Sequence, residues 1–239
     1  MKKNPMTISI IIFIFAAGGF LTGCSNGSND NNDNQAPELK FRVTVVNLTA
    51  NQPFSPVAVV LHGKGYTPWV SGQAASADLE ALAEGGSPDQ FIASADADQD
   101  VMDTVSGAAP VGMGAKDMFE VTAGRNSNIY LSLATMLVNT NDAYVGINSA
   151  NIENLAVGDS RILFANGFDA GTEANSEALA DIPGPAGGGE GFNAARDDKD
   201  IITGHPGVVT ANDGLLTSAL DESHRWDNPV AEITVMRFE

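Results

Sequence analysis

Residues 161–173 read RILFANGFDAGTE, an apolar segment followed by a short acidic loop, and the rest of the chain is best interpreted outward from this stretch. The apolar residues 161–165 predict a β-strand. Beyond the strand, Asp169 and Glu173 stand on either side of Gly171, a residue that permits a tight turn. Calcium prefers several hard oxygen ligands from a flexible loop, so the pattern predicts a calcium-binding corner. A solvated acidic turn is the alternative.

Several other segments have the pattern of β-strands separated by turns. Residues 39–49 alternate apolar and polar side chains, and residues 57–62 form a second apolar segment after a proline-containing loop. Residues 119–122 and 129–138 predict a pair of strands around a short turn, and residues 230–238 predict the last strand. Many short strands with little helix favour an all-β fold, a β-sandwich.

Helix is expected in one short segment. Residues 76–84 carry apolar side chains at helical spacing, begin at Ser76 as a cap and end at Gly85 and Gly86. Residues 89–114 are acidic, alanine-rich and weakly patterned, and we expect a loop with one short element there. Residues 177–200 are rich in glycine and proline, which predicts an irregular excursion within the domain.

The first residues have the pattern of a bacterial lipoprotein signal. Lys2 and Lys3 precede the apolar run 8–17, which is too short to span a membrane and ends in small residues. The run leads to residues 21–24 (LTGC), which resemble a lipobox, so we expect Cys24 to become the lipid-modified first residue of the mature protein. A plain signal peptide with an unrelated cysteine is the alternative.

Cys24 is the only cysteine in the sequence, so no intramolecular disulfide forms and the domain depends on its core and on metal. Ser25 follows it, and by resemblance to the sorting rule of Gram-negative lipoproteins this favours the outer membrane. The next residues are almost all Asn, Ser, Gly and Asp, a composition typical of a flexible tether. We therefore expect a signal peptide at 1–23, a tether at 24–38 and one globular domain at 39–239.

The charge balance excludes some partners. The chain has 12 Lys and Arg against 30 Asp and Glu, a formal net charge of −18. Affinity for nucleic acid or anionic lipid depends on Lys and Arg close to phosphates, so both are poor partners for this surface. An acidic surface is compatible with divalent cations, and equally with selection for solubility.

Known catalytic motifs are absent from the sequence or incomplete. Residues 96–100 (DADQD) have the alternating acids of an EF-hand loop, but the sixth position is not glycine and no glutamate closes the loop at the twelfth, so we expect a solvated loop. Residues 158–160 (GDS) are similar to the start of a GDSL hydrolase motif without the rest of it. There is no G-x-S-x-G, no H-E-x-x-H and no glycine-rich phosphate loop.

The order of segments resembles the spondin N-terminal domain family, the module of F-spondin and mindin that also occurs in bacterial secreted proteins. The matching segments are 41–49, 54–56 with 59–62, 72–76 with 82–86, 131–136, 141–146 and 169–173. The resemblance extends from Leu39 to Glu239. It implies an antiparallel β-sandwich like a C2 domain, with long loops and one or two short helices, in which loops at one end gather acidic side chains around one calcium ion.

Carried over residue by residue, the resemblance implies that Asp142, Asp169 and Glu173 are metal ligands. The family usually has Asp where Glu173 stands, but glutamate also binds calcium, often through both oxygens. Glu84 is an additional candidate for the metal shell. His62 and His205 match positions where family members often carry histidine. We expect both to make structural hydrogen bonds near the loops, with a zinc site or a general base as the alternative.

Three aromatic side chains, Trp69, Trp226 and Tyr144, have the chemistry of a platform for a sugar or a peptide. Large aromatics next to prolines and glycines more often close the ends of a sandwich. Packing is therefore the first expectation for them.

The expected function is that of a non-enzymatic, membrane-anchored adhesion or binding module outside the cytoplasm. Calcium would order the loops that contact an envelope or extracellular protein or glycan. One alternative is a metal-dependent hydrolase of envelope or extracellular polymers that uses Asp142, Asp169, Glu173 and a histidine around an open metal position. The other is an envelope scaffold without metal.

Overall fold

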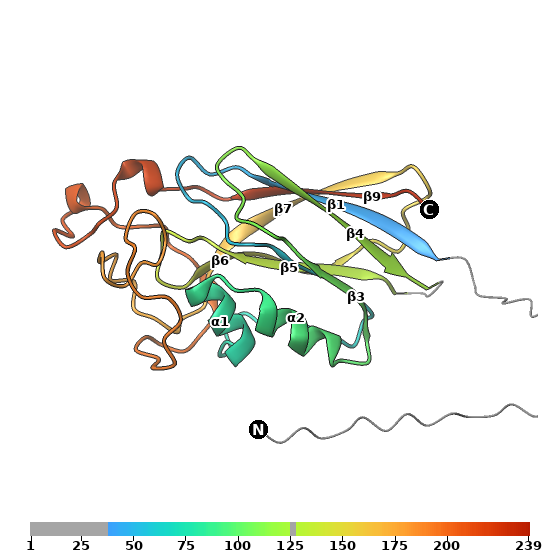
Figure 1. Cartoon of the computed structure of the whole chain (residues 1–239), viewed down its shortest axis with the longest axis horizontal. Helices are drawn as coiled ribbons and strands as arrows, with labels where there is room; N and C mark the ends of the chain where they lie inside the picture. Colours follow the sequence, from blue (N-terminus) through green and yellow to red (C-terminus); the bar gives the residue numbers. More distant parts are fainter. Residues whose placement is uncertain (1–37, 125–127) are drawn as a thin grey trace, which may run out of the picture. The chain divides into compact units, whose positions relative to one another are not determined.

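Two layers of antiparallel strands and a pair of helices make up the fold (Figure 1). The computed structural model describes residues 38–124 and 128–239, and within these residues nine strands are joined in the order β3-β2-β5-β6-β7-β9-β1-β4, with β8 paired to β7. The first layer contains β4 (Lys116–Ala123), β1 (Leu39–Asn47), β9 (Ala231–Arg237) and the first part of β7 (Ser160–Asp169). The second contains β3 (Val101–Ser106), β2 (Ala58–His62), β5 (Tyr130–Met136), β6 (Ala143–Asn151) and the rest of β7.

Strand β7 belongs to both layers and ends at the acidic loop. Its residues from Ser160 to Ala165 pair with β9, and those from Asn166 to Asp169 pair with β6. The two-residue strand β8 (Thr203–Gly204) pairs with its last residues. The strand that the sequence places before the acidic corner is therefore the strand that joins the two layers.

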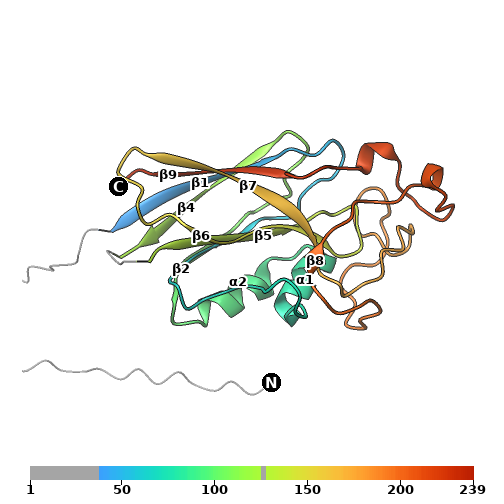
Figure 2. The ribbon, with the colours of Figure 1, turned by 180° about the vertical axis from the view of Figure 1, so that it is seen from behind.

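The burial pattern follows from the number of layers that cover each strand. In β1 every second residue is buried, because one face packs on the second layer and the other faces solvent. In β2 all five residues are buried. The helices α1 (Ala77–Gly85) and α2 (Asp89–Asp96) cover the outer face of the second layer, as Figure 2 shows from behind. One apolar core thus lies between the strand layers and another beneath the helices.

Most of the predicted elements are confirmed, including the all-β sandwich. Strands occupy residues 39–47, 58–62, 160–169 and 231–237. Helix α1 begins after Ser76 and ends at Gly86 in the left-handed conformation (φ 69°), although the Ser76 side chain makes no capping hydrogen bond. Two short 3₁₀ helices, η1 (Ala211–Asp213) and η2 (Glu222–His224), lie in the last long loop.

Two predictions about the middle of the chain are wrong. Residues 89–114 are not mainly loop, because they contain both α2 and β3. Helix α2 buries only Phe91 and Ala95, and β3 is an edge strand whose residues are half-buried or exposed, so neither has a strong apolar pattern. The second error concerns pairing: β4 pairs with β1, and β5 pairs with β2 and β6, because the chain crosses between layers after β4. Strand β6 was not anticipated.

Among the residues with described positions, no helix has the length and apolar character needed to cross a membrane. The predicted signal peptide, Cys24 and residues 25–37 of the predicted tether lie outside the described residues.

Candidate functional site

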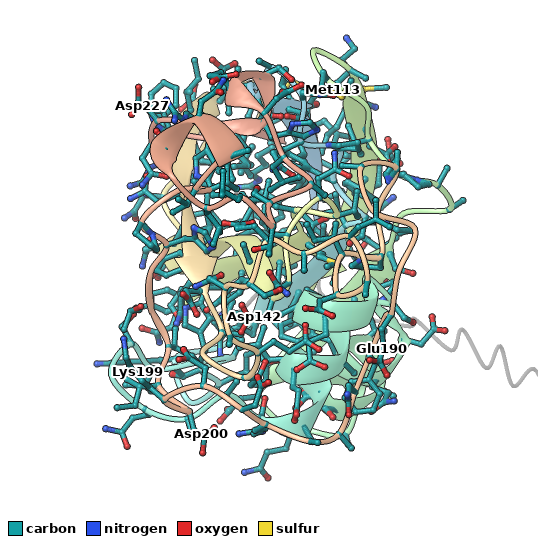
Figure 3. All side chains as sticks on the ribbon, turned by 90° about the vertical axis from the view of Figure 1, so that its left-hand side faces the viewer. Met113, Asp142, Glu190, Lys199, Asp200 and Asp227 are labelled. Carbon is teal, nitrogen blue, oxygen red and sulfur yellow. The ribbon has the colours of Figure 1, made fainter. Side chains whose placement is uncertain are left out.

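The acidic side chains singled out from the sequence meet at the loop end of the sandwich, which Figure 3 shows face on with Asp142 labelled. Asp169 is the last residue of β7, and Asp142 immediately precedes β6. The neighbouring residue Ala143 pairs with Asp169 across these two strands. The strand register therefore brings the two aspartates side by side from positions far apart in the sequence.

Asp142 is fully buried and holds the acidic loop in place. Its Oδ2 accepts hydrogen bonds from the Thr172 backbone N–H at 2.7 Å, from the Glu173 backbone N–H at 3.1 Å and from the Thr172 hydroxyl at 3.2 Å. Its Oδ1 is buried and has no hydrogen-bond partner. Burial, followed by the charge of Asp169, raises the pKa of Asp142 to about 7.

Both oxygens of Asp169 are engaged within the loop. Oδ1 accepts from the Gly171 backbone N–H at 2.8 Å, and Oδ2 accepts from the Asn175 side-chain amide at 2.8 Å. Gly171 has φ 71°, and a Cβ there would lie 2.5 Å from the Ile201 carbonyl oxygen. The glycine is thus required by the turn and by close packing, and Asp169 shapes the loop in addition to carrying charge.

Glu173 and Glu84 complete the cluster. Burial, then the charges of Glu84 and Asp142, raise the pKa of the half-buried Glu173 to about 8. Glu84 lies in α1 and is fully buried; its Oε2 accepts from the Asn193 backbone N–H at 2.9 Å. Its Oε1 has no hydrogen-bond partner, because the Thr172 hydroxyl donates to Asp142, although that hydroxyl is close enough to Glu84 to offset part of the rise in its pKa. Burial also raises the pKa of Glu84. Three carboxyl groups, from α1, the turn before β6 and the acidic loop, therefore all have raised pKa values, because burial and mutual repulsion disfavour their ionised forms.

A cavity of about 200 Å³ opens beside this cluster. Polar side chains dominate its lining: Asn141, Glu173, Ser176, Asp181, Glu190, Asn193 and Asp197. Asp197 and Asp181 also raise the pKa of Glu173 by their charge. Arg196, which belongs to the same segment, is paired with Glu80 and Asp200. The cavity is therefore electronegative and rich in oxygen.

The donor chemistry of this cluster fits a hard cation. Two buried carboxylate oxygens, Asp142 Oδ1 and Glu84 Oε1, have no hydrogen-bond partner. Glu173 is close enough for the charges of both residues to raise its pKa. Within residues 38–124 and 128–239, no three His, Cys, Asp or Glu side chains are already arranged as a metal site. Binding an ion would therefore require the carboxylates to move closer together.

The two histidines have structural partners. His62 is buried at the end of β2, with Nε2 2.8 Å from Ser132 Oγ and Nδ1 2.7 Å from the Gly63 carbonyl oxygen. It pairs with Tyr130 at the start of β5, whereas Asp142 follows the end of that strand, so the structure does not bring His62 to the acidic cluster. Burial lowers the pKa of His62.

His205 lies closer to the cluster. Its Nε2 is 3.2 Å from Asn175 Oδ1, and the amide of Asn175 donates to Asp169, so His205 supports that aspartate indirectly. Its Nδ1 accepts from the Gly207 backbone N–H at 3.0 Å. Burial lowers the pKa of His205 to about 4. Both ring nitrogens have hydrogen-bond partners, so a zinc ion would have to displace one of them.

Two of the three aromatics pack in the core. The ring of Trp69 meets Tyr144 edge to face at 5.3 Å, and Tyr144 stacks on Phe168 at 5.4 Å. Trp226 is only half-buried, and its ring lies 5.0 Å from that of His205. Packing is thus the role of Trp69 and Tyr144, while Trp226 reaches the surface.

Sequence reasoning did not identify several polar residues of the site. Thr172 lies inside the acidic loop 169–173, so its position between two predicted ligands was a local signal that could have identified it. Asp181, Asn193 and Asp197 belong to the irregular segment 177–200, whose path over the cluster is held by long-range bonds such as the Asp197 N–H to the Thr172 carbonyl oxygen. No local pattern reports such contacts.

One protein-family model matches the part of the chain that contains the acidic cluster. The family model described as Spondin_N matches residues 47–179, more than half of the chain, and this part contains Glu84, Asp142, Asp169 and Glu173 but neither His205 nor Trp226. No curated protein matches the chain. The family is one of non-enzymatic binding domains. The matched residues include the strands and the loop that build the acidic end, and the chain therefore belongs to the Spondin_N family.

Proposed function

We propose that this protein is a calcium-dependent extracytoplasmic binding module, attached to a membrane by lipid on Cys24. The observation that carries the calcium site is the pair of buried, unpartnered carboxylate oxygens on Asp142 and Glu84 next to the half-buried Glu173. The family match supports a binding module in the coarser sense. It assigns no ligand.

The carboxylates would act by fixing the loops. Asp142 already holds residues 172 and 173 through hydrogen bonds, and Glu84 holds the Asn193 backbone. Calcium, when bound, supplies the positive charge that lets Asp142, Glu84 and Glu173 ionise together at neutral pH. Loops fixed in this way lose less conformational entropy when they contact a partner, which strengthens binding.

Membrane attachment is proposed from the lipobox pattern at residues 21–24, and the outer membrane from Ser25. Replacing the acceptor cysteine tests it. Wild-type protein should label with palmitate and fractionate with membranes, and Cys24→Ser protein should do neither. Membrane recovery and labelling of the Cys24→Ser variant would show that the lipoprotein assignment is wrong.

A thermal melt of the full chain in mild detergent tests the calcium site. The melting temperature is measured in chelator and then in calcium, magnesium and zinc separately. An ion at 100 times its dissociation constant stabilises the folded state by about 2.7 kcal/mol, which for a domain of this size raises the melting temperature by roughly 5–10 °C. We expect this rise with calcium, and none with magnesium at the same concentration.

Glu173→Gln should remove most of the calcium response, and the matched control Glu153→Gln, in the turn after β6, should retain it. Equal responses in the two variants, or no response in the wild type, would contradict the proposed site. A response to zinc alone would instead support the hydrolase alternative.

A further inference from the structure

A second cavity, of about 440 Å³, lies at the same end of the domain and is separate from the acidic cluster. Its lining includes Pro206, Val208, Asp213, Arg225, Trp226 and Asp227. Figure 3 shows Asp227 at the outer rim of this end and Asp142 further inside. We call this cavity the Trp226 cleft.

The aromatic wall of the cleft is held rigidly. Trp226 is half-buried and packs against both the main core and the small cluster of Ile182, Val208 and Leu220. The His205 ring supports it at 5.0 Å. A fixed indole at the surface attracts a cation to its face, more strongly than any other aromatic side chain.

The charged side chains that line the cleft leave one negative charge unbalanced. Arg225 pairs with Asp213, and this guanidinium, with hydrogen bonds from Thr210, lowers the pKa of Asp213 to about 2. Asp213 and Arg225 therefore neutralise each other. Asp227 is exposed and forms no hydrogen bond or ion pair with any residue of the described chain. One carboxylate at the cleft thus lacks a counter-ion, in a chain whose formal net charge is −18.

We infer that the Trp226 cleft binds a cationic side chain, arginine or lysine, of a basic peptide segment in the partner. The cation would lie against the indole of Trp226 and pair with the carboxylate of Asp227. A neutral sugar would also stack on Trp226, but it would not use the charge of Asp227. This inference extends the proposed function by naming a ligand chemistry, and it rests on that function in requiring a binding module.

The cleft is connected to the proposed calcium loop through hydrogen bonds. Pro206 and Gly207 follow His205 directly, and His205 reaches Asp169 through Asn175. Peptide binding is therefore measured both in calcium and in chelator, so that the two proposals are tested separately.

The probe is an acetylated, amidated hexapeptide with two arginines among glycines, and its matched control has glutamine at both positions. Full-length protein in mild detergent is titrated with each peptide, and binding is followed by tryptophan fluorescence and by calorimetry. Trp69 and Trp226 are the only tryptophans, and Trp69 is buried in the core, so a change in emission reports on the cleft. We expect saturable binding of the arginine peptide that weakens as sodium chloride is added.

The decisive variants are Asp227→Asn and Trp226→Leu, with Asp89→Asn as the control that removes the same charge from an exposed position on α2. Asp227→Asn and Trp226→Leu should each weaken arginine-peptide binding by about tenfold, and Asp89→Asn should leave it within about twofold. Asp227 is exposed, so its replacement tests the cleft even where Trp226→Leu impairs folding.

Three results would overturn the inference. The first is equal affinity for the arginine and glutamine peptides, and the second is an equal loss in Asp89→Asn and Asp227→Asn, which would indicate non-specific attraction to an acidic protein. The third is binding of a neutral oligosaccharide that depends on Trp226 but survives Asp227→Asn, with no binding of the arginine peptide. If calcium raises the melting temperature but the peptide does not bind, only the cleft proposal is contradicted. If the peptide binds but calcium does not raise the melting temperature, only the calcium-site proposal is contradicted.

Discussion

Two loops of this protein have similar acidic sequences and different physical states. Residues 96–100 (DADQD) begin at the last residue of α2, and Asp96, Asp98 and Asp100 are all exposed. Residues 169–173 (DAGTE) begin at the last residue of β7, and there Asp169 is buried and Glu173 half-buried. In the first loop Asp98 Oδ1 accepts from the Asp100 N–H at 2.8 Å, a local turn. The second loop is closed over Asp142, which comes from a different strand connection.

The difference shows that the number of carboxylates does not make a candidate site. Water solvates exposed carboxylates well, so they can ionise close together at little cost. Buried carboxylates repel one another without that screening, and the pKa of Asp142 rises to about 7 and that of Glu173 to about 8. Desolvation by the surrounding fold is what distinguishes the second loop, and a bound cation there would offset the repulsion between its carboxylates.

The largest effect is expected at the residue that closes the second loop. Asp142→Ala removes the acceptor of three hydrogen bonds from Thr172 and Glu173. We expect the free energy of unfolding, measured by urea denaturation in chelator, to fall by about 3 kcal/mol. Asp142→Asn retains an acceptor and should cost less. A loss below about 1 kcal/mol for Asp142→Ala would mean that the loop is held elsewhere.

A smaller effect is expected from the segment that crosses the cluster. Arg196→Met leaves the Glu80 carboxylate without its partner, and the side chain of Glu80 is only 6% exposed. The free energy of unfolding should fall by about 2 kcal/mol, less than for a fully buried pair because Arg196 itself is partly exposed. The matched control is Arg42→Met, which breaks the exposed pair with Glu120 and should cost at most about 1 kcal/mol. Equal losses would remove the distinction between these two ion pairs.

The pH dependence of stability should also separate the two loops. Asp142 and Glu173 have folded pKa values of about 7 and about 8, above those of the unfolded chain, so the folded state binds more protons over this range. In chelator, stability should therefore fall as pH rises from about 6.5 to about 8. The buried Glu177, with a pKa of about 7, contributes in the same direction. The lowered pKa of His205 acts at lower pH, where it makes stability rise with pH.

Melts at pH 6.5, 7.25 and 8 measure this slope. Calcium should reduce it, since the bound ion favours the ionised carboxylates, and Glu173→Gln should reduce it in chelator. The reverse sign, with stability rising over the same range in chelator, would contradict the raised pKa values.

The smallest effect is expected in the exposed loop. Asp98→Ala removes only the local bond to the Asp100 N–H. The free energy of unfolding should change by no more than about 0.5 kcal/mol. The calcium-dependent rise in melting temperature should be unchanged. A loss of that rise in Asp98→Ala would place a calcium site in the EF-hand-like loop instead.

Much of the fold could be predicted because the relevant signals are local. The alternation in β1 and the Gly86 stop of α1 are properties of a few neighbouring residues. Helix α2 and strand β3 were missed because they bury few apolar side chains, and β4 and β5 were wrongly paired because alternation does not identify a partner. The resemblance to the family supplied Asp142, Asp169 and Glu173, and the structure places Asp142 near Asp169 and places Glu173 near both Asp142 and Glu84.

The sequence by itself determined most of the strands, the acidic corner, the absence of any intramolecular disulfide and the excess of negative charge, since each depends on residue type and short spacing. The tertiary structure alone decided which acids are desolvated and that Trp226 borders a cleft with Asp227. It also decided that His62, in β2, lies beside the start of β5, away from the acidic cluster. Burial and long-range hydrogen bonds, such as those from the 169–173 loop to Asp142, depend on how distant segments pack. Local composition carries no record of that packing.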